Sequence, residues 1–228
     1  MNIFVLDQDP TRAAHAQCDK HVIRMLVESC QLLASAYWVE LGVRSRKAVL
    51  ANPNAASIVS ELWEGFPRKV DQDKYDGTPL QGLQHEPYWA THTNHPCAIW
   101  VRESVANFNW LVDHAIGLAE AYTLRYNKTN ACESVAHWFK ENPPKSATTD
   151  GLSRMLFSSY CEQQGLQYEP IFASEGLTPF AQSIPEEYRG DNAVEAHRLS
   201  YMETKARFAV WRYTDAPAWW NPAVNAFV

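Results

Sequence analysis

Apolar side chains recur every three or four residues over two long stretches of the chain, which predicts two long helices at the centre of the fold. The first helix is expected over residues 10–40, with Asp9 as its N-cap, Pro10 in its first turn and Gly42 as its stop. The second is expected over residues 96–126. The inward positions of the first helix are Ile23, Leu26, Val27, Cys30, Leu33, Ala34, Tyr37 and Trp38, and those of the second are Ile99, Val105, Phe108, Leu111, Val112, Ala115, Leu118, Ala119 and Tyr122.

Shorter elements fill the rest of the chain. Three further helices are predicted, over residues 132–141, 151–165 and 191–213, the last two begun by Asp150 and Asp191. Proline and glycine interrupt residues 44–96, which are expected to form a loop with one short helix near residues 55–64. The apolar opening, residues 1–6, predicts a short buried strand. The aromatic tail at residues 217–222 is expected to pack onto the body of the domain.

Composition supports one packed domain over residues 1–228. The chain is 46% hydrophobic and 12% aromatic, which excludes a disordered protein and allows a sizeable core. No run approaches the roughly 18 apolar residues of a membrane span, and the opening is too short for a signal peptide. The prediction is therefore a soluble, mainly α-helical protein of the cytoplasm, or of the host cytoplasm if the chain is viral.

Charge and cysteine content narrow the function classes. The net charge of −6 argues against strong non-specific binding to duplex DNA, which depends on neutralisation of phosphates by Lys and Arg, although a local basic cleft is compatible with it. The five cysteines are odd in number, widely spaced and without a CxxC pair, so free buried thiols are expected rather than a disulfide framework or a zinc ribbon. No P-loop, GxGxxG, GxSxG or HExxH motif is present.

A first candidate cluster lies on the first long helix. His21, Arg24 and Glu28 are spaced so that all three project from one helical face, with Lys20 beside them. Histidine is the natural acid–base group near neutral pH. The alternative is an ion-paired helix edge without catalytic function. His15, Cys18 and His21 also share a stripe with the spacing of metal ligands, but no accompanying signature supports a metal site.

A second candidate cluster directly precedes the second long helix. His92, Asn94 and His95 stand among threonines where the free backbone N–H groups of a helix start favour an anion, such as a substrate phosphate or carboxylate. Arg102 lies further along this helix and extends the polar site. The alternative is ordinary capping of the helix by Asn94 or Thr93, with His95 packed beside it.

A third candidate cluster lies near the C-terminus. The segment 184–191, Ile-Pro-Glu-Glu-Tyr-Arg-Gly-Asp, precedes the last predicted helix. Its Arg189, together with Lys205 and the pair Trp219-Trp220, could form the aromatic and cationic wall on which nucleic-acid bases stack. The alternative is a capped helix with a solvated charged face.

Taken in order, these blocks resemble the pyrimidine-dimer DNA glycosylases of phages and bacteria. The blocks are the extended opening, the helix with Lys-His-Val-Ile-Arg at residues 20–24, Asn-His-Pro at 94–96 before a long helix, the block at 184–191 and the aromatic tail. The opening and the Asn-His-Pro-Cys block also resemble uncharacterised tailed-phage proteins. The resemblance covers about half of the chain, and the chain is longer through insertions at about residues 44–87 and 131–178.

The resemblance implies glycosylase or lyase chemistry on a nucleobase, without a required cofactor. The family uses its N-terminal α-amine as nucleophile and a glutamate that stabilises the cationic sugar. Three departures stand out. The family glutamate aligns with His21, while Glu28 lies two turns along the same helical face. Asn2 is bulky, so Met1 is expected to be retained. The family is basic, whereas this chain is acidic.

Three functional hypotheses result. The first is an enzyme of glycosidic-bond or base-modification chemistry on a nucleobase, nucleotide or modified base in nucleic acid, with His21, Glu28 and His95 catalytic and Lys20, Arg24, His92, Asn94, Arg102, Arg189 and Lys205 binding substrate. The second is an enzyme that uses a divalent metal held by some of His15, His21, Glu28, His92 and His95. The third is a non-catalytic phage protein that binds a host partner or a nucleotide.

Overall fold

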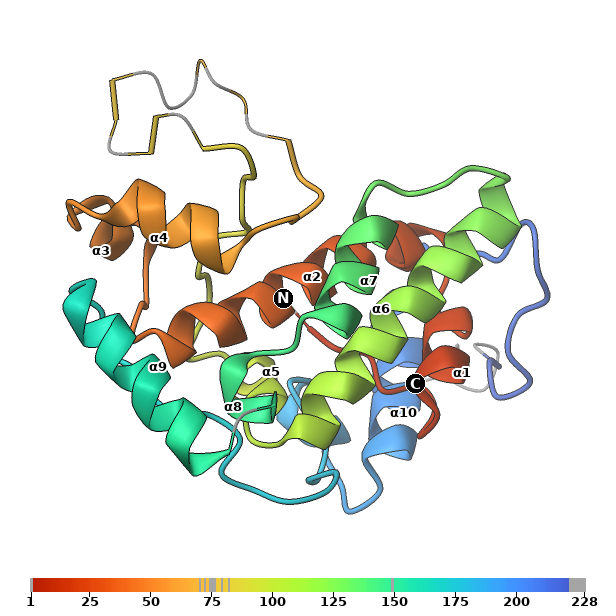
Figure 1. The fold of residues 1–228 in the computed structure, drawn as a ribbon. Coiled ribbons are helices and arrows are strands. Elements are labelled where there is room, and N and C mark those ends of the chain that lie inside the picture. Colours follow the sequence, from red (N-terminus) through yellow and green to blue (C-terminus); the bar gives the residue numbers. More distant parts are fainter. Residues whose placement is uncertain are drawn as a thin grey trace.

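The computed structural model describes residues 2–69, 83–148 and 150–221, together with 71, 73, 77, 78, 80 and 81 (Figure 1). In chain order its helices are α1 (Pro10–His15), α2 (Asp19–Glu40), α3 (Arg46–Leu50), α4 (Ala55–Leu62), α5 (Pro96–Val101), α6 (Val105–Tyr126), α7 (Cys132–Glu141), α8 (Lys145–Thr148), α9 (Gly151–Gln163), the 3-10 turn η2 (Glu186–Tyr188) and α10 (Ala193–Lys205). The described residues include no strand, and none of their helices is long and apolar enough to cross a membrane. The mainly α-helical prediction is confirmed.

Helices α2 and α6 form the centre of the core and run antiparallel (Figure 1). Near the end of α6, Arg125 bonds to Asp19 at the start of α2, at 3.1 Å. At the opposite end, Tyr37 of α2 contacts Phe108 of α6, with ring centroids 6.3 Å apart. Helices α1 and α7 also pack on α6. The prediction of two long central helices is therefore correct, and each of them is interrupted once.

The first interruption separates α1 from α2. Cys18 has extended backbone (φ −68°, ψ 163°) where a continuous helix over residues 10–40 was expected. The guanidinium of Arg125 binds the carbonyl oxygens of His15 and Gln17, each at 2.8 Å. These carbonyl groups would otherwise be left without helical partners. A long-range contact thus stabilises a break that local helix propensity does not indicate.

The second interruption separates α5 from α6. Ser104 has extended backbone, and its hydroxyl accepts from the N–H of Asn107, as an N-cap does. The side-chain amide of Asn107 in turn donates to the carbonyl oxygen of Trp100, at 2.7 Å. The expected helix over residues 96–126 therefore divides at a polar pair. Ile23 and Ile99, expected inside, are instead 44% and 40% exposed.

The other elements vary in how closely they match the expectation. Helix α7 has the predicted bounds, and α9 begins after Asp150, whose carboxylate accepts from Ser153 N–H at 2.8 Å. The region of residues 44–64 holds two short helices, α3 and α4, rather than one. Helix α10 starts after Asn192 instead of Asp191 and ends at Lys205, not near residue 213. It ends early because the following backbone binds α2: Val210 accepts from the N–H of Asp19.

Both ends of the described chain pack as expected, although not as regular structure. Residues 3–6 are buried but form no strand, so the strand prediction is wrong and the burial is correct. Trp219 and Trp220 each pack edge-on against Tyr201 of α10, with centroids 6.2 and 6.1 Å apart. Residue 222, the last position of the predicted tail, lies outside the described residues.

We expect Gly42→Ala to lower the free energy of unfolding by about 2–3 kcal/mol. Gly42 follows α2 with φ +68°, a conformation that costs an L-residue about 1–2 kcal/mol. A Cβ there would also lie 2.4 Å from the carbonyl oxygen of Gln167, so the backbone must shift. Gly176→Ala is the matched control, because Gly176 has φ +65° with open space around it. Urea denaturation should show the smaller loss for Gly176→Ala; equal losses would contradict the close approach at Gln167.

Candidate active site

The opening segment brings Asn2 onto the polar face of α2. The backbone N–H of Asn2 donates to Glu28 Oε2, at 3.1 Å, and Arg24 Nε donates to Glu28 Oε1, at 3.2 Å. The side chain of Glu28 is 17% exposed, whereas that of Arg24 is 70% exposed. Glu28 is therefore a half-buried carboxylate, reachable from solvent, next to the first described residue of the chain.

Two further segments meet at the same place. The side-chain amide of Asn2 donates to the carbonyl oxygen of Ser183, at 3.0 Å, and its Oδ1 accepts from the Cys97 thiol, at 3.5 Å. His95 Nδ1 accepts from the Cys97 N–H, at 3.2 Å, so a neutral ring has its proton on Nε2 and donates it to Ser183 Oγ, at 3.2 Å. The start of the chain, α2, the start of α5 and the segment before η2 thus converge on one site.

His95 is held in its neutral form. Burial lowers its pKa first, followed by the positive amino terminus and by His92, while the carboxylate of Glu28 acts in the opposite direction. Near neutral pH the Nε2–H of His95 is therefore a hydrogen-bond donor without a charge. Such a group can bind a substrate oxygen or hold Ser183 in place.

His21 lies in a more buried setting than the sequence pattern indicates. It is only 7% exposed, stacks on Phe4 with centroids 4.8 Å apart, and shares a hydrogen bond of 2.7 Å between its Nδ1 and the hydroxyl of Tyr201. Burial, followed by the charges of Lys205, Lys20 and Arg24, lowers the pKa of His21 to about 4. The ring is thus neutral near pH 7 and packs as part of the core under the site.

The cations that lower the pKa of His21 also form a local basic surface on a protein that is acidic as a whole. Lys20, Arg24 and Lys205 all act on His21, although they come from both ends of the chain. The ammonium of Lys20 lies 4.7 Å from the ring centre of Phe208, and that of Lys205 lies 5.5 Å from the ring centre of Phe4. Three cations, two of them beside aromatic rings, suit a phosphate followed by a base.

The remaining predicted residues divide into exposed and structural groups. His92 and Asn94 are exposed in the loop before α5, and His92 has a positive φ of 50°. Arg102 donates to the carbonyl oxygens of Thr93 and Ala98, at 2.6 and 3.0 Å, so it fixes the loop onto α5. Arg189 is exposed, and its Nε donates to the carbonyl oxygen of Ile184, at 3.1 Å.

The predicted metal ligands do not come together. His15 lies beside Glu120, at 3.8 Å, rather than near Glu28, and Cys18 bonds to the hydroxyl of Tyr201. Among the residues that the structure describes, no group of three or more His, Cys, Asp or Glu side chains is arranged to hold a metal ion. All five cysteines are buried and free, as expected.

Sequence reasoning missed Asn2, Ser183 and Tyr201. The sequence points to Asn2 only as the residue expected to retain Met1, and Ser183 lies in an irregular stretch without a local pattern. Their positions depend on contacts between residues 88 to 181 positions apart. The one available signal was the order of the polar blocks along the chain.

Comparison with known proteins adds no relative. No protein-family model, curated protein or solved structure matches the chain.

Proposed function

We propose that this protein cleaves or modifies the glycosidic bond of a nucleobase in nucleic acid or a nucleotide, with Glu28 as the central carboxylate. The observation that supports this function is the hydrogen bond from Asn2 N–H to Glu28 at one junction of four segments. These segments are the ones on which the resemblance to pyrimidine-dimer DNA glycosylases rests. Glu28, rather than His21, takes the role of the family glutamate.

The arrangement suits nucleophilic attack by an amine at the start of the chain. The amine attacks the sugar carbon C1′ as the bond from C1′ to the base breaks, and the base leaves with the bonding electron pair and takes up a proton. The amine loses one proton; the bond from C1′ to the ring oxygen then breaks with its electron pair on the oxygen, which takes up the second amine proton as the nitrogen lone pair forms the imine. Glu28 stabilises the positive charge that develops on the sugar, and Arg24 orients that carboxylate through their hydrogen bond.

The basic surface supplies the binding step of this proposal. One or two phosphates bind to the cations Lys20, Arg24 and Lys205. Phe208 provides an apolar face beside them. His95 donates its Nε2–H to a substrate oxygen when the substrate displaces Ser183. This local binding is compatible with a net charge of −6, because a local basic cleft can bind nucleic acid on a protein that is acidic as a whole.

Borohydride trapping tests the chemistry directly. The protein is incubated with normal, abasic, dimer-containing and modified-base oligonucleotides, single- and double-stranded, and borohydride reduces any imine to a stable adduct. We expect an adduct on at least one substrate, located by mass spectrometry in the amino-terminal peptide. The intact mass of the protein shows whether Met1 or Asn2 bears the amine. An absence of adduct and of base release on every substrate would overturn the proposal.

Glu28→Gln should lower the rate of base release at least about a hundredfold, as removal of one transition-state charge partner typically does. The fold should persist, because the amide oxygen still accepts from Asn2 and the Arg24 pair is mostly exposed. Glu169→Gln is the matched control, since Glu169 also pairs with an arginine, Arg44, at 2.7 Å. Equal rates for the two variants would exclude Glu28 from the chemistry.

A further inference from the structure

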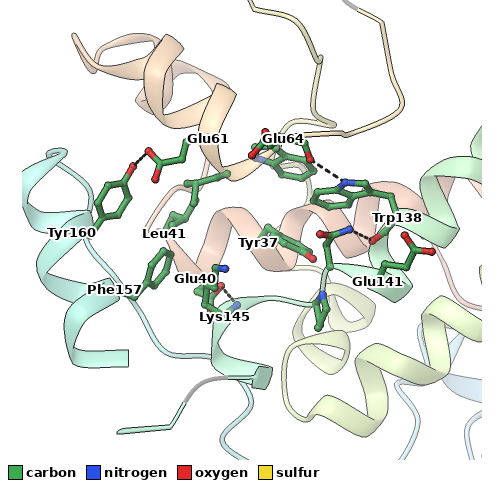
Figure 2. A pocket seen from close by; sticks show the side chains of 14 residues that line it. Tyr37, Glu40, Leu41, Glu61, Glu64, Trp138, Glu141, Lys145, Phe157 and Tyr160 are labelled. Carbon is green, nitrogen blue, oxygen red and sulfur yellow. Dashed lines mark hydrogen bonds between the residues drawn. The ribbon is translucent and has the colours of Figure 1, made fainter. Parts of the chain in front are cut away.

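A cavity lies at the other end of α2, away from the candidate active site. It has a volume of about 610 Å³ (Figure 2). Tyr37 lines it and stands nine residues beyond Glu28 on α2, roughly 14 Å along the helix axis. Its other walls come from residues 61–64 and 138–160, which belong to the two insertions that lengthen this chain relative to the glycosylase pattern.

The floor of this cavity is aromatic. Trp63 and Trp138 stack almost parallel, with ring centroids 5.6 Å apart, and Tyr37 contacts both of them at 5.4 and 5.8 Å. Figure 2 shows Tyr37 in the middle of the lining side chains, with Tyr160 on one side and Trp138 on the other. The faces of such rings carry negative potential and attract cations.

The rim of the cavity is acidic. Glu61, Glu64 and Glu141 are exposed and line it, and Glu61 accepts a hydrogen bond from the hydroxyl of Tyr160. The fourth lining carboxylate, Glu40, is buried and already binds the backbone N–H groups of Lys145 and Ser146. Lys145 is the one basic residue of the lining, and its charge acts on Glu40. The three rim carboxylates therefore leave a surplus of negative charge.

Two buried polar groups of the floor lack hydrogen-bond partners among the described residues. These are the indole N–H of Trp63, a residue that is 0% exposed, and the hydroxyl of Tyr37. Buried donors without a partner are rare, because each leaves a desolvation cost uncompensated. An oxygen acceptor on a bound ligand would satisfy them.

We propose that this cavity binds a small organic ammonium ion that also bears an oxygen acceptor, an amino alcohol being the simplest case. The ammonium lies over the ring of Tyr37 between the rim carboxylates. The oxygen accepts from the two unpartnered donors. The site is separate from Glu28 and does not depend on the proposed glycosidic chemistry.

Calorimetric titration of the full chain tests the ligand class. The probes are choline, its neutral carbon analogue 3,3-dimethyl-1-butanol, and tetramethylammonium, which has the charge without the oxygen. We expect choline to bind saturably, the neutral analogue at least about tenfold more weakly, and tetramethylammonium between them. Absence of choline binding up to about 10 mM, or equal affinity for the neutral analogue, would overturn the proposal.

Variants of the rim residues and of Tyr37 test whether choline binds in this cavity. The double variant Glu64→Gln/Glu141→Gln should weaken choline binding about tenfold, because both residues are exposed on the rim and their loss leaves the core intact. Glu187→Gln/Glu203→Gln removes the same charge from exposed positions outside the cavity and should leave the affinity unchanged. Choline binding that is equal in both double variants would show that the ion binds elsewhere. Tyr37→Phe should weaken the binding of choline more than that of tetramethylammonium, since only choline has an oxygen that accepts from the Tyr37 hydroxyl.

Discussion

Acidification from pH 7.5 to pH 5 is expected to lower the free energy of unfolding by about 6 kcal/mol. Three buried histidines cause this loss. Burial lowers the pKa of His114 to about 3 and is the largest cause of the lowered pKa values of His21 and His197, each about 4. An unfolded histidine has a pKa of about 6.5, so below that pH the unfolded chain binds protons that the folded chain does not.

The sign and the size of this change in the free energy of unfolding follow from the difference in proton binding between the unfolded and the folded chain. At pH 5 each unfolded histidine has gained most of one proton, while its folded counterpart stays neutral, which costs about 2 kcal/mol per residue. The loss begins near pH 6.5 and continues until the folded pKa values of about 4 and 3 are reached. Burial raises the pKa of Glu40, so this carboxyl group opposes the loss at the acidic end. A total of about 6 kcal/mol is comparable with the whole stability of an ordinary domain.

Urea denaturation at several pH values measures the effect. The free energy of unfolding should change by about 4 kcal/mol per pH unit near pH 5, which corresponds to three protons. His114→Gln should reduce that slope by about one proton, because His114 is fully buried and its Nδ1 has no partner among the described residues. His137→Gln alters an exposed histidine and should leave the slope unchanged. A stability that is flat between pH 7 and pH 5 would contradict the buried neutral state.

The same histidines illustrate what the sequence could and could not predict. Spacing alone placed His21, Arg24 and Glu28 on one face of a helix, and the helix exists. Spacing could not distinguish a solvated face from one covered by the opening segment, since Phe4 and Tyr201 cover His21 through long-range packing. Glu28, one turn beyond Arg24, remains accessible, with 17% of its side chain exposed beside Asn2.

Helix bounds show the same division between local and long-range causes. Helix α7 and the start of α9 are encoded locally, by a proline pair after one and a capping aspartate before the other. The breaks at residues 16–18 and 102–104 are set by Arg125 and Asn107, which bind carbonyl oxygens from separate segments. The periodicity of apolar residues contains no information about such long-range partners. The cavity at Tyr37 could not be foreseen either, because two insertions build it together.

Arg125→Met should lower the free energy of unfolding by about 3–5 kcal/mol, the cost typical of breaking a buried ion pair on one side. The side chain of Arg125 is 1% exposed and that of its partner Asp19 is 9% exposed. The substitution leaves the Asp19 carboxylate without its cation and the carbonyl oxygens of His15 and Gln17 without their donor. Methionine fills much of the volume, so the loss reports the polar contacts rather than a cavity.

A double-mutant cycle separates these contributions. Asp19→Asn in the Arg125→Met background removes the stranded charge, while the asparagine oxygen can still accept from the N–H of Arg212. The free energy of unfolding of the double variant should therefore fall by less than the sum of the decreases in the two single variants. Arg44→Met is the matched control, because the Arg44–Glu169 pair is roughly half exposed and should contribute less than about 1 kcal/mol. If Arg125→Met is no more harmful than Arg44→Met, the break between α1 and α2 does not depend on Arg125.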